Sequence, residues 1–102
     1  MLTSKDRAYL RGIANTLPTT QQIGKDGVTE AVCRQADEEL NAKELIKLRV
    51  LESALLTARE ASEQLCAAIG AEPVQCIGSK LVLYRPSPDA PQYPLPSLSK
   101  KK

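Results

Sequence analysis

The sequence predicts a two-layer α/β domain with the element order α-β-α-β-α-β-β and a four-stranded mixed sheet. Three observations support this: apolar residues recur alternately at helix and strand spacing, a capping residue precedes each helical stretch, and residues 78–80 divide the last two strands. The two β-α-β passages imply right-handed crossovers and largely parallel pairing, with one antiparallel strand at the end. We expect the helices to pack on the apolar face of the sheet.

The first helix is predicted to begin at Thr3 or Ser4, because Thr3 and Asp6 have the spacing of a capping box. Pro18 lies just beyond the expected end of this helix. The stripe expected to be buried comprises Leu10, Ile13, Ala14 and Leu17. A short strand is predicted next, at residues 20–23.

The second helix is predicted over residues 29–41, with Thr29 as its capping residue. Its apolar side comprises Val28, Val32, Cys33, Ala36 and Leu40. Residues 45–51 alternate as a strand does, so Lys47 and Arg49 share one face. The opposite, apolar face comprises Ile46, Leu48 and Val50.

The third helix is predicted to begin at the capping box formed by Thr57 and Glu60, and to end at Gly70. The residues that we expect it to bury are Ala61, Leu65, Ala68 and Ile69. Two strands follow, at residues 74–77 and 81–84. The residues between them, 78–80, are typical of a tight hairpin.

The length of 102 residues suits one domain, which we place at residues 1–85. Residues 86–102 contain five prolines and end in three lysines. Proline neither propagates a helix nor pairs within a central strand, so we expect this segment to be a flexible tail.

The net charge of +2 comes from the tail, because residues 1–85 carry eleven basic and eleven acidic side chains. A polyanion would therefore have to be bound by charges that are segregated on the surface rather than present in excess. Lys5, Arg7 and Arg11 lie close together near the N-terminus. The acidic residues gather near the end of the second helix: Asp37, Glu38, Glu39 and Glu44.

The composition argues against several functional classes. The chain has no histidine, which excludes His-dependent triads and disfavours most catalytic metal sites. Cys33, Cys66 and Cys76 form no CxxC pair, so we expect small core residues in a reduced compartment rather than disulfides or zinc ligands. No apolar run approaches the roughly 20 residues that span a bilayer, and the N-terminus lacks a signal-peptide pattern.

The strongest functional signal is the Gly-Lys-Asp-Gly sequence at residues 24–27, between the first strand and the second helix. Two glycines permit positive φ angles and close backbone approach, and a helix N-terminus favours an anion in front of it. With Lys25 at its tip, this loop suits a nucleic-acid phosphate, although GxxG also occurs in ordinary turns. The phosphate-loop motif of transferase enzymes is absent, since Asp26 follows Lys25 where that motif has Ser or Thr.

Several segments together resemble the CRM domain family, and most closely its stand-alone bacterial, YhbY-type form. They are LTSK (2–5), YLR (9–11), QIGKDGVT (22–29), RQADE (34–38), ELIKL (44–48) and VQCIGSKLVLYRP (74–86). Residues 52–56 and the tail depart from the family pattern. The resemblance implies a fold related to the C-terminal domain of initiation factor three and an association with the precursor of the large ribosomal subunit. Similar domains occur in chloroplast splicing factors, but a compact chain without a transit-peptide pattern suits the bacterial form.

The RNA-contacting loop of that family falls on Gly24, Lys25, Asp26 and Gly27 of this sequence. We expect the amides of Gly27 and Val28 to contact phosphate oxygens, while Asp26 either points away or hydrogen-bonds locally. Further candidates, each of which could instead be solvated surface, are Arg7, Arg11, Lys80 and Arg85. Lys47 and Arg49 either contact RNA or form cross-strand ion pairs.

The sequence thus predicts a monomeric, cytoplasmic, RNA-binding protein that takes part in ribosome assembly and is not an enzyme. We expect its partner to be ribosomal RNA, with no cofactor, metal, small-molecule substrate or membrane. Only Tyr9 and Tyr84 provide rings in the domain, so phosphate, sugar and shape should dominate recognition. The alternative is a protein-interaction module that binds a basic ribosomal protein through the acidic end of the second helix.

Overall fold

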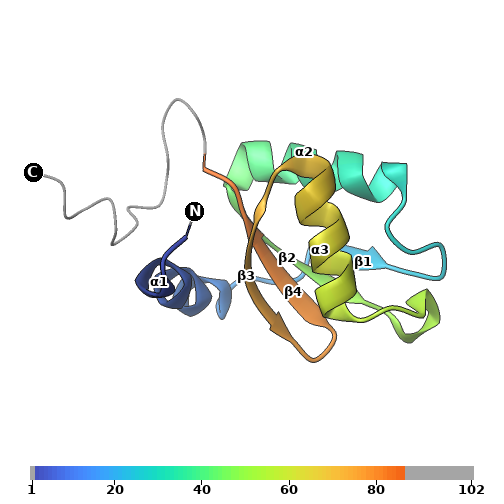
Figure 1. The fold of residues 1–102 in the computed structure, drawn as a ribbon, viewed down its shortest axis with the longest axis horizontal. Coiled ribbons are helices and arrows are strands. Elements are labelled where there is room, and N and C mark those ends of the chain that lie inside the picture. The colour runs from blue at the N-terminus through green and yellow to red at the C-terminus, as the bar shows by residue number, and fades with distance from the viewer. Residues whose placement is uncertain (1, 87–102) are drawn as a thin grey trace, which may run out of the picture.

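In the computed structural model, which describes residues 2–86, helices and strands follow one another in the predicted order (Figure 1). They are α1 (Ser4–Ala14), β1 (Gln21–Ile23), α2 (Glu30–Lys43), β2 (Leu45–Val50), the short 3-10 helix η1 (Glu52–Ala54), α3 (Ala58–Ile69), β3 (Glu72–Ile77) and β4 (Lys80–Tyr84). Apart from Pro86, the segment predicted to be a tail lies outside the described residues.

Threonine hydroxyls cap all three α-helices, as the sequence predicts. Thr3 and Asp6 exchange side-chain-to-backbone hydrogen bonds of 3.1 Å, and Thr57 and Glu60 form the same kind of capping box. The hydroxyl of Thr29 accepts a bond from the Val32 amide. These contacts satisfy amides that have no partner within their own helix, and so fix where each helix begins.

The four strands form one mixed sheet in the order β1-β2-β4-β3. The pair β1 and β2 is parallel, whereas β2 with β4 and β4 with β3 are antiparallel, so the prediction of largely parallel pairing is wrong. The tight turn at Gly78 and Ser79 makes β4 fold back along β3. Because residues 81–84 are all buried, β4 takes a central place in the sheet and separates β3 from β2.

Helices cover both faces of the sheet, which adds a layer to the two that the sequence predicts (Figure 1). Residues from α2 and α3 pack with Ile46, Leu48 and Leu83 in the larger core cluster. On the opposite face, α1 packs through Leu10 and Ala14 in a second cluster. The sheet residues of that cluster are Leu45, Val74, Val82 and Tyr84. The alternation of β4 explains this arrangement, because its successive residues are apolar on both faces.

Several local features differ from the sequence prediction. Helix α2 ends at Lys43 rather than at residue 41, and Lys80 belongs to β4 rather than to the turn. Ala68 is exposed, and Ala58 is buried at the start of α3 instead. Strand β3 begins two residues earlier than predicted and includes Pro73. Proline is tolerated on an edge strand, where a backbone amide can face away from the sheet and needs no partner on a neighbouring strand. Cys76 is exposed on β3 rather than buried in the core. Within residues 2–86, no helix is long and apolar enough to cross a membrane.

Candidate nucleic-acid interface

The Gly-Lys-Asp-Gly segment forms a closed turn between β1 and α2. The amide of Gly27 donates to the carbonyl of Gly24 at 2.9 Å, so the expectation that this amide contacts a phosphate oxygen is wrong. Gly27 has a φ of +70°. A side chain at Gly27 would therefore be strained, and its Cβ would also lie 3.4 Å from the Leu56 side chain. Lys25 and Asp26 are exposed at the tip of the turn.

The turn lies directly in front of the N-terminus of α2. The Thr29 hydroxyl accepts from Val32, and the Thr29 carbonyl accepts from Cys33 at 3.0 Å. The amides of Glu30 and Ala31 in the first turn consequently have no intrahelical acceptor. Such amides, with the helix dipole behind them, favour an anion placed beside Gly27.

The turn alone is not strongly positive, because Lys25 is accompanied by Asp26 and by Glu30 in the first turn of α2. Within residues 2–86, the carboxylate of Asp26 has no hydrogen-bond partner, so the turn does not need it as a brace. The local hydrogen bond predicted as one of two possibilities for Asp26 is therefore absent among the described residues.

Additional positive charge comes from the sheet. Pairing places Gln22, Arg49, Lys80 and Ile77 opposite one another on the four strands, and we refer to these four residues as the terminal row. The terminal row crosses the sheet one residue before β1 enters the turn. All four side chains are exposed, on the face that α1 covers only further along the strands.

Arg49 and Lys80 in the terminal row are like charges on directly opposed positions. Such a pair is unfavourable in an antiparallel sheet unless something neutralises it. Neither residue forms an ion pair among the described residues, where the only one joins Arg85 and Asp37. The ion pairs considered for Arg49 are thus absent, and its guanidinium is available to an anion.

Lys47 has a different role from Arg49, although both lie on the same face of β2. Its ammonium donates to the carbonyls of Ala14 and Leu17, at 3.2 and 3.3 Å. These carbonyls end α1 and its following turn, where a cation is favourable. Lys47 therefore helps to hold α1 on the sheet.

Three of the predicted contact residues, Arg7, Arg11 and Arg85, lie away from the turn. The Arg7 side chain donates to the Pro73 carbonyl at 3.3 Å, and Pro73 pairs with Leu83, three residues or about 10 Å along β4 from Lys80. Arg85 donates four hydrogen bonds to α2 and to the end of α3. Arg11 is exposed on α1, on the other face of the sheet from α2.

The acidic residues of α2 are mostly engaged within the domain. Asp37 pairs with Arg85 at 2.7 Å, and the Glu39 carboxylate accepts from Thr20 at 2.6 Å and from Gln21 at 3.2 Å. Glu44 is buried, and it connects α2 directly to β2. Only Glu38 of this cluster is fully exposed and without a described contact within residues 2–86.

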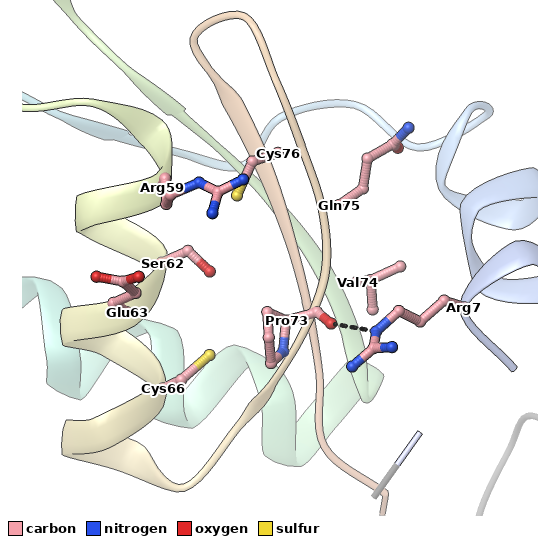
Figure 2. Close-up of a pocket in the computed structure, with 9 residues that line it drawn as sticks. All are labelled: Arg7, Arg59, Ser62, Glu63, Cys66, Pro73, Val74, Gln75 and Cys76. Atoms are coloured by element: carbon pink, nitrogen blue, oxygen red, sulfur yellow. Dashed lines mark hydrogen bonds between the residues drawn. The ribbon is translucent and has the colours of Figure 1, made fainter. Parts of the chain in front are cut away.

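A separate pocket of about 550 Å³ lies between α3 and the outer edge of β3. Figure 2 shows Arg59, Ser62 and Cys66 extending into it from α3, with Arg7 on the far side of β3. Burial raises the pKa of the Cys66 thiol, the charges of Glu72 and Cys76 add to the effect, and a hydrogen bond with Ser62 opposes it. The thiol is thus held neutral, which is unlike an activated nucleophile. No group of residues within 2–86 has the composition of a metal site.

Gln22 in the terminal row was not among the residues predicted from sequence, and Arg49 was one of two open possibilities. These two residues become candidates because of the register of the strands, since only the pairing of β1 with β2 and of β2 with β4 places them in one row with Lys80. The one available signal was the position of Gln22, two residues before the GxxG turn on a strand of alternating burial.

Comparisons with known proteins agree with the resemblance noted in the sequence. The model of the CRS1 / YhbY (CRM) domain matches residues 2–85. The chain is 38% identical over 96 residues to the Bacillus subtilis "Probable RNA-binding protein YqeI", covering 94% of this chain and 100% of that protein. It is 36% identical over 89 residues to a Haemophilus influenzae protein named "RNA-binding protein", covering 87% of this chain and 90% of that one.

A solved structure has the same fold. The solution structure of the hypothetical protein SAV1595 from Staphylococcus aureus superimposes with a TM-score of 0.77 and 38% identity, covering 94% of this chain and 100% of that one. The predicted element order and mixed sheet are therefore those of a known structure. With the family model matching nearly all of the described residues, the chain belongs to the CRS1 / YhbY (CRM) domain family.

Proposed function

We propose that this protein binds RNA through the turn at residues 24–27, the N-terminus of α2 and the terminal row of the sheet. The observation that carries the proposal is the closed glycine turn set directly before free helix amides, with Arg49 and Lys80 unpaired at the same end of the sheet. Two relatives named as RNA-binding proteins, over nearly their whole lengths, support the same ligand.

The turn and the terminal row would have complementary roles. The amides of Glu30 and Ala31 can donate to one phosphate beside Gly27, because Gly27 has no side chain that would intervene. The amide of Gly27 itself is used by the Gly24 carbonyl. Lys25, Arg49 and Lys80 can then contact neighbouring phosphates, as the backbone of the nucleic acid passes from the turn onto the sheet. Such contacts fix the position of the RNA backbone through hydrogen bonds and charge, and they need no catalytic group. We propose a binding role rather than an enzymatic one.

We further propose that the RNA is ribosomal RNA in a precursor of the large subunit, bound in the cytoplasm during ribosome assembly. This part rests on the family resemblance. The rival proposal, a protein-interaction module centred on the acidic end of α2, has less support because Asp37 and Glu39 are used within the domain. Binding of purified RNA by the purified protein would separate the two proposals.

The first experiment compares Lys25→Ala with Lys43→Ala in binding to single-stranded RNA at moderate salt. Both changes remove one exposed lysine charge, but Lys43 lies at the far end of α2. We expect Lys25→Ala to weaken binding by about 1–2 kcal/mol, because it removes a charge-assisted contact, and Lys43→Ala to bind as the wild type does. Equal affinities for both folded variants would mean that the turn does not contact RNA.

A second matched pair in the same assay is Gly27→Asp and Gly27→Asn. Both side chains have the same size and tolerate the left-handed backbone of Gly27, so they share any cost of strain. Only Asp adds a negative charge beside the proposed phosphate. We expect Gly27→Asp to bind at least about 1 kcal/mol more weakly than Gly27→Asn, and equal binding would place the phosphate elsewhere.

The ribosomal part of the proposal needs a test in cells. Crosslinking and sequencing of RNA bound to the full chain should give reads concentrated in large-subunit ribosomal RNA, in the gradient fractions that contain subunit precursors. The Lys25→Ala protein should lose most of these reads, and the Lys43→Ala protein should keep them. Reads spread over messenger RNA would contradict the ribosomal assignment while leaving RNA binding in place.

A further inference from the structure

An apolar hollow adjoins the glycine turn. Its volume is about 440 Å³, and the residues that line it include Val50, Leu51, Leu55 and Leu56 together with Glu52 and Glu60. Two of the leucines that line the hollow also lie close to the turn. The Leu56 side chain lies 3.4 Å from the position that a Cβ of Gly27 would take, and the Leu51 side chain lies 4.0 Å from that of Gly24. In Figure 1, the β1–α2 turn and the segment between β2 and α3 lie side by side at the right of the molecule.

Leu55 is the unusual residue of this hollow. It is 92% exposed, the most exposed large apolar side chain among the described residues, and it has a left-handed backbone with φ of +58°. A leucine in this conformation is strained, and burial of its side chain offers no compensation within the domain. The neighbouring core therefore does not explain why an apolar side chain projects here.

The position of the hollow limits what could occupy it. In single-stranded RNA, each base is joined to its phosphate through a single ribose, so a base next to a phosphate held at Gly27 would reach the adjoining hollow. Glu52 and Glu60 would repel a second phosphate. The Glu52 carboxylate, and the Glu60 oxygen that the Thr57 amide does not use, can accept hydrogen bonds from the N–H groups of a base edge. A base in a duplex is stacked and paired and could not enter.

We propose that this hollow binds one unpaired nucleobase of the RNA whose phosphate lies at the glycine turn, with Leu55 packed against the base. The inference rests on the proposed function and deepens it. It adds a base contact to an interface otherwise made of phosphate contacts, and it makes the protein selective for single-stranded RNA over duplex RNA. The base-stacking rings of other RNA-binding domains are replaced here by aliphatic side chains.

The test uses the full chain and two fluorescent probes of equal length, roughly 12 nucleotides. One is a single-stranded oligoribonucleotide of mixed sequence, and the other is an abasic oligomer with the same number of phosphates. The proteins are the wild type, Leu55→Ser and Leu55→Met. Because Leu55 is almost fully exposed, all three should fold alike, and Leu55→Met retains an apolar side chain of similar volume.

We expect the wild type and Leu55→Met to bind the base-bearing oligomer about fivefold more tightly than the abasic one. Leu55→Ser should lose this preference and bind the abasic oligomer as the wild type does, because the base and Leu55 act on the same contact. If the wild type binds both oligomers equally, or Leu55→Ser keeps the full preference, the base site is wrong and the phosphate interface stands. If the wild type binds neither oligomer, the proposed function itself fails.

Discussion

At the scale of single residues, a cation is available to a ligand only if its donors are not already used. Lys80 begins β4 and Arg85 directly follows it, and the two were equal candidates in the sequence. The Arg85 guanidinium donates to the Asp37 carboxylate and to the Ile69 carbonyl, each at 2.7 Å. It also donates to the Asp37 carbonyl and to Asn41. Lys80 has no such contacts among the described residues, so the two side chains have different roles.

We therefore predict that Arg85→Ala destabilises the domain by about 1–2 kcal/mol, since charged hydrogen bonds to partly exposed groups are lost. Arg85→Lys should recover little of this, because an ammonium cannot reproduce the forked geometry that reaches two helices. Thermal unfolding followed by circular dichroism measures both effects. At temperatures where the variants are folded, RNA affinity should equal that of the wild type, and a selective loss of affinity would mean that Arg85 contacts RNA.

The sequence identified the residue types of the site better than their neighbours in space. Gly24, Gly27 and Thr29 could be predicted because turn and capping chemistry acts over a few residues. Lys47 and Arg49 could not be told apart, since the acceptors of Lys47 lie at the end of α1 and in the turn after it, about thirty residues earlier. Lys47 reaches these carbonyls and Arg49 does not, because α1 covers only part of this face of the sheet.

At the scale of elements, local signals located the helices well and the strand pairing poorly. Thr3, Thr29 and Thr57 cap the helices where the sequence predicts. The pairing of β4 with β2 depends instead on which position buries the four apolar residues 81–84, and this is settled by the whole sheet. The whole sheet also explains why α1 covers the second face, because the residues of β4 are apolar on both sides of the sheet.

Two glycines allow the helix boundaries to be tested with one kind of substitution. Gly12 lies inside α1, and Gly70 ends α3 with φ of +68°; a methyl group at either would meet nothing within 4 Å. We expect Gly12→Ala to stabilise the domain by up to about 1 kcal/mol, because alanine loses less entropy in a helix. Gly70→Ala should destabilise it by a similar amount, because alanine is strained in the left-handed region. Chemical denaturation would contradict these boundaries if both changes had the same sign.

At the scale of the whole molecule, the charges of a neutral domain are sorted by position. Arg49 and Lys80 lie unpaired at the end of the sheet beside the glycine turn, whereas Asp37 and Glu39 are paired toward the other end of α2. Residues 87–102 add Asp89 and three lysines to this distribution. We propose that these lysines add loose phosphate contacts without stabilising the domain.

Truncation after Pro86 tests this proposal with two measurements. We expect the thermal midpoint not to change, because the proline-rich segment has no apolar periodicity with which to pack on the domain. The slope of the logarithm of RNA affinity against the logarithm of salt concentration should decrease by about 2, at roughly 0.7 per lost contact on single strands. A lower midpoint would mean that the tail packs on the domain, and an unchanged slope would mean that its lysines do not touch RNA.

The junction between α2 and β2 has a consequence for how quickly a ligand can be recognised. Glu44 is the only residue between these elements, and Ile23, just before the glycine turn, pairs with Val50 of the same strand. The turn and α2 are thus anchored at both ends on β2, so the entropy of ordering this loop is lost during folding rather than during association. An RNA segment arriving at this surface would find its binding groups already in place, and encounter would then limit the rate of association.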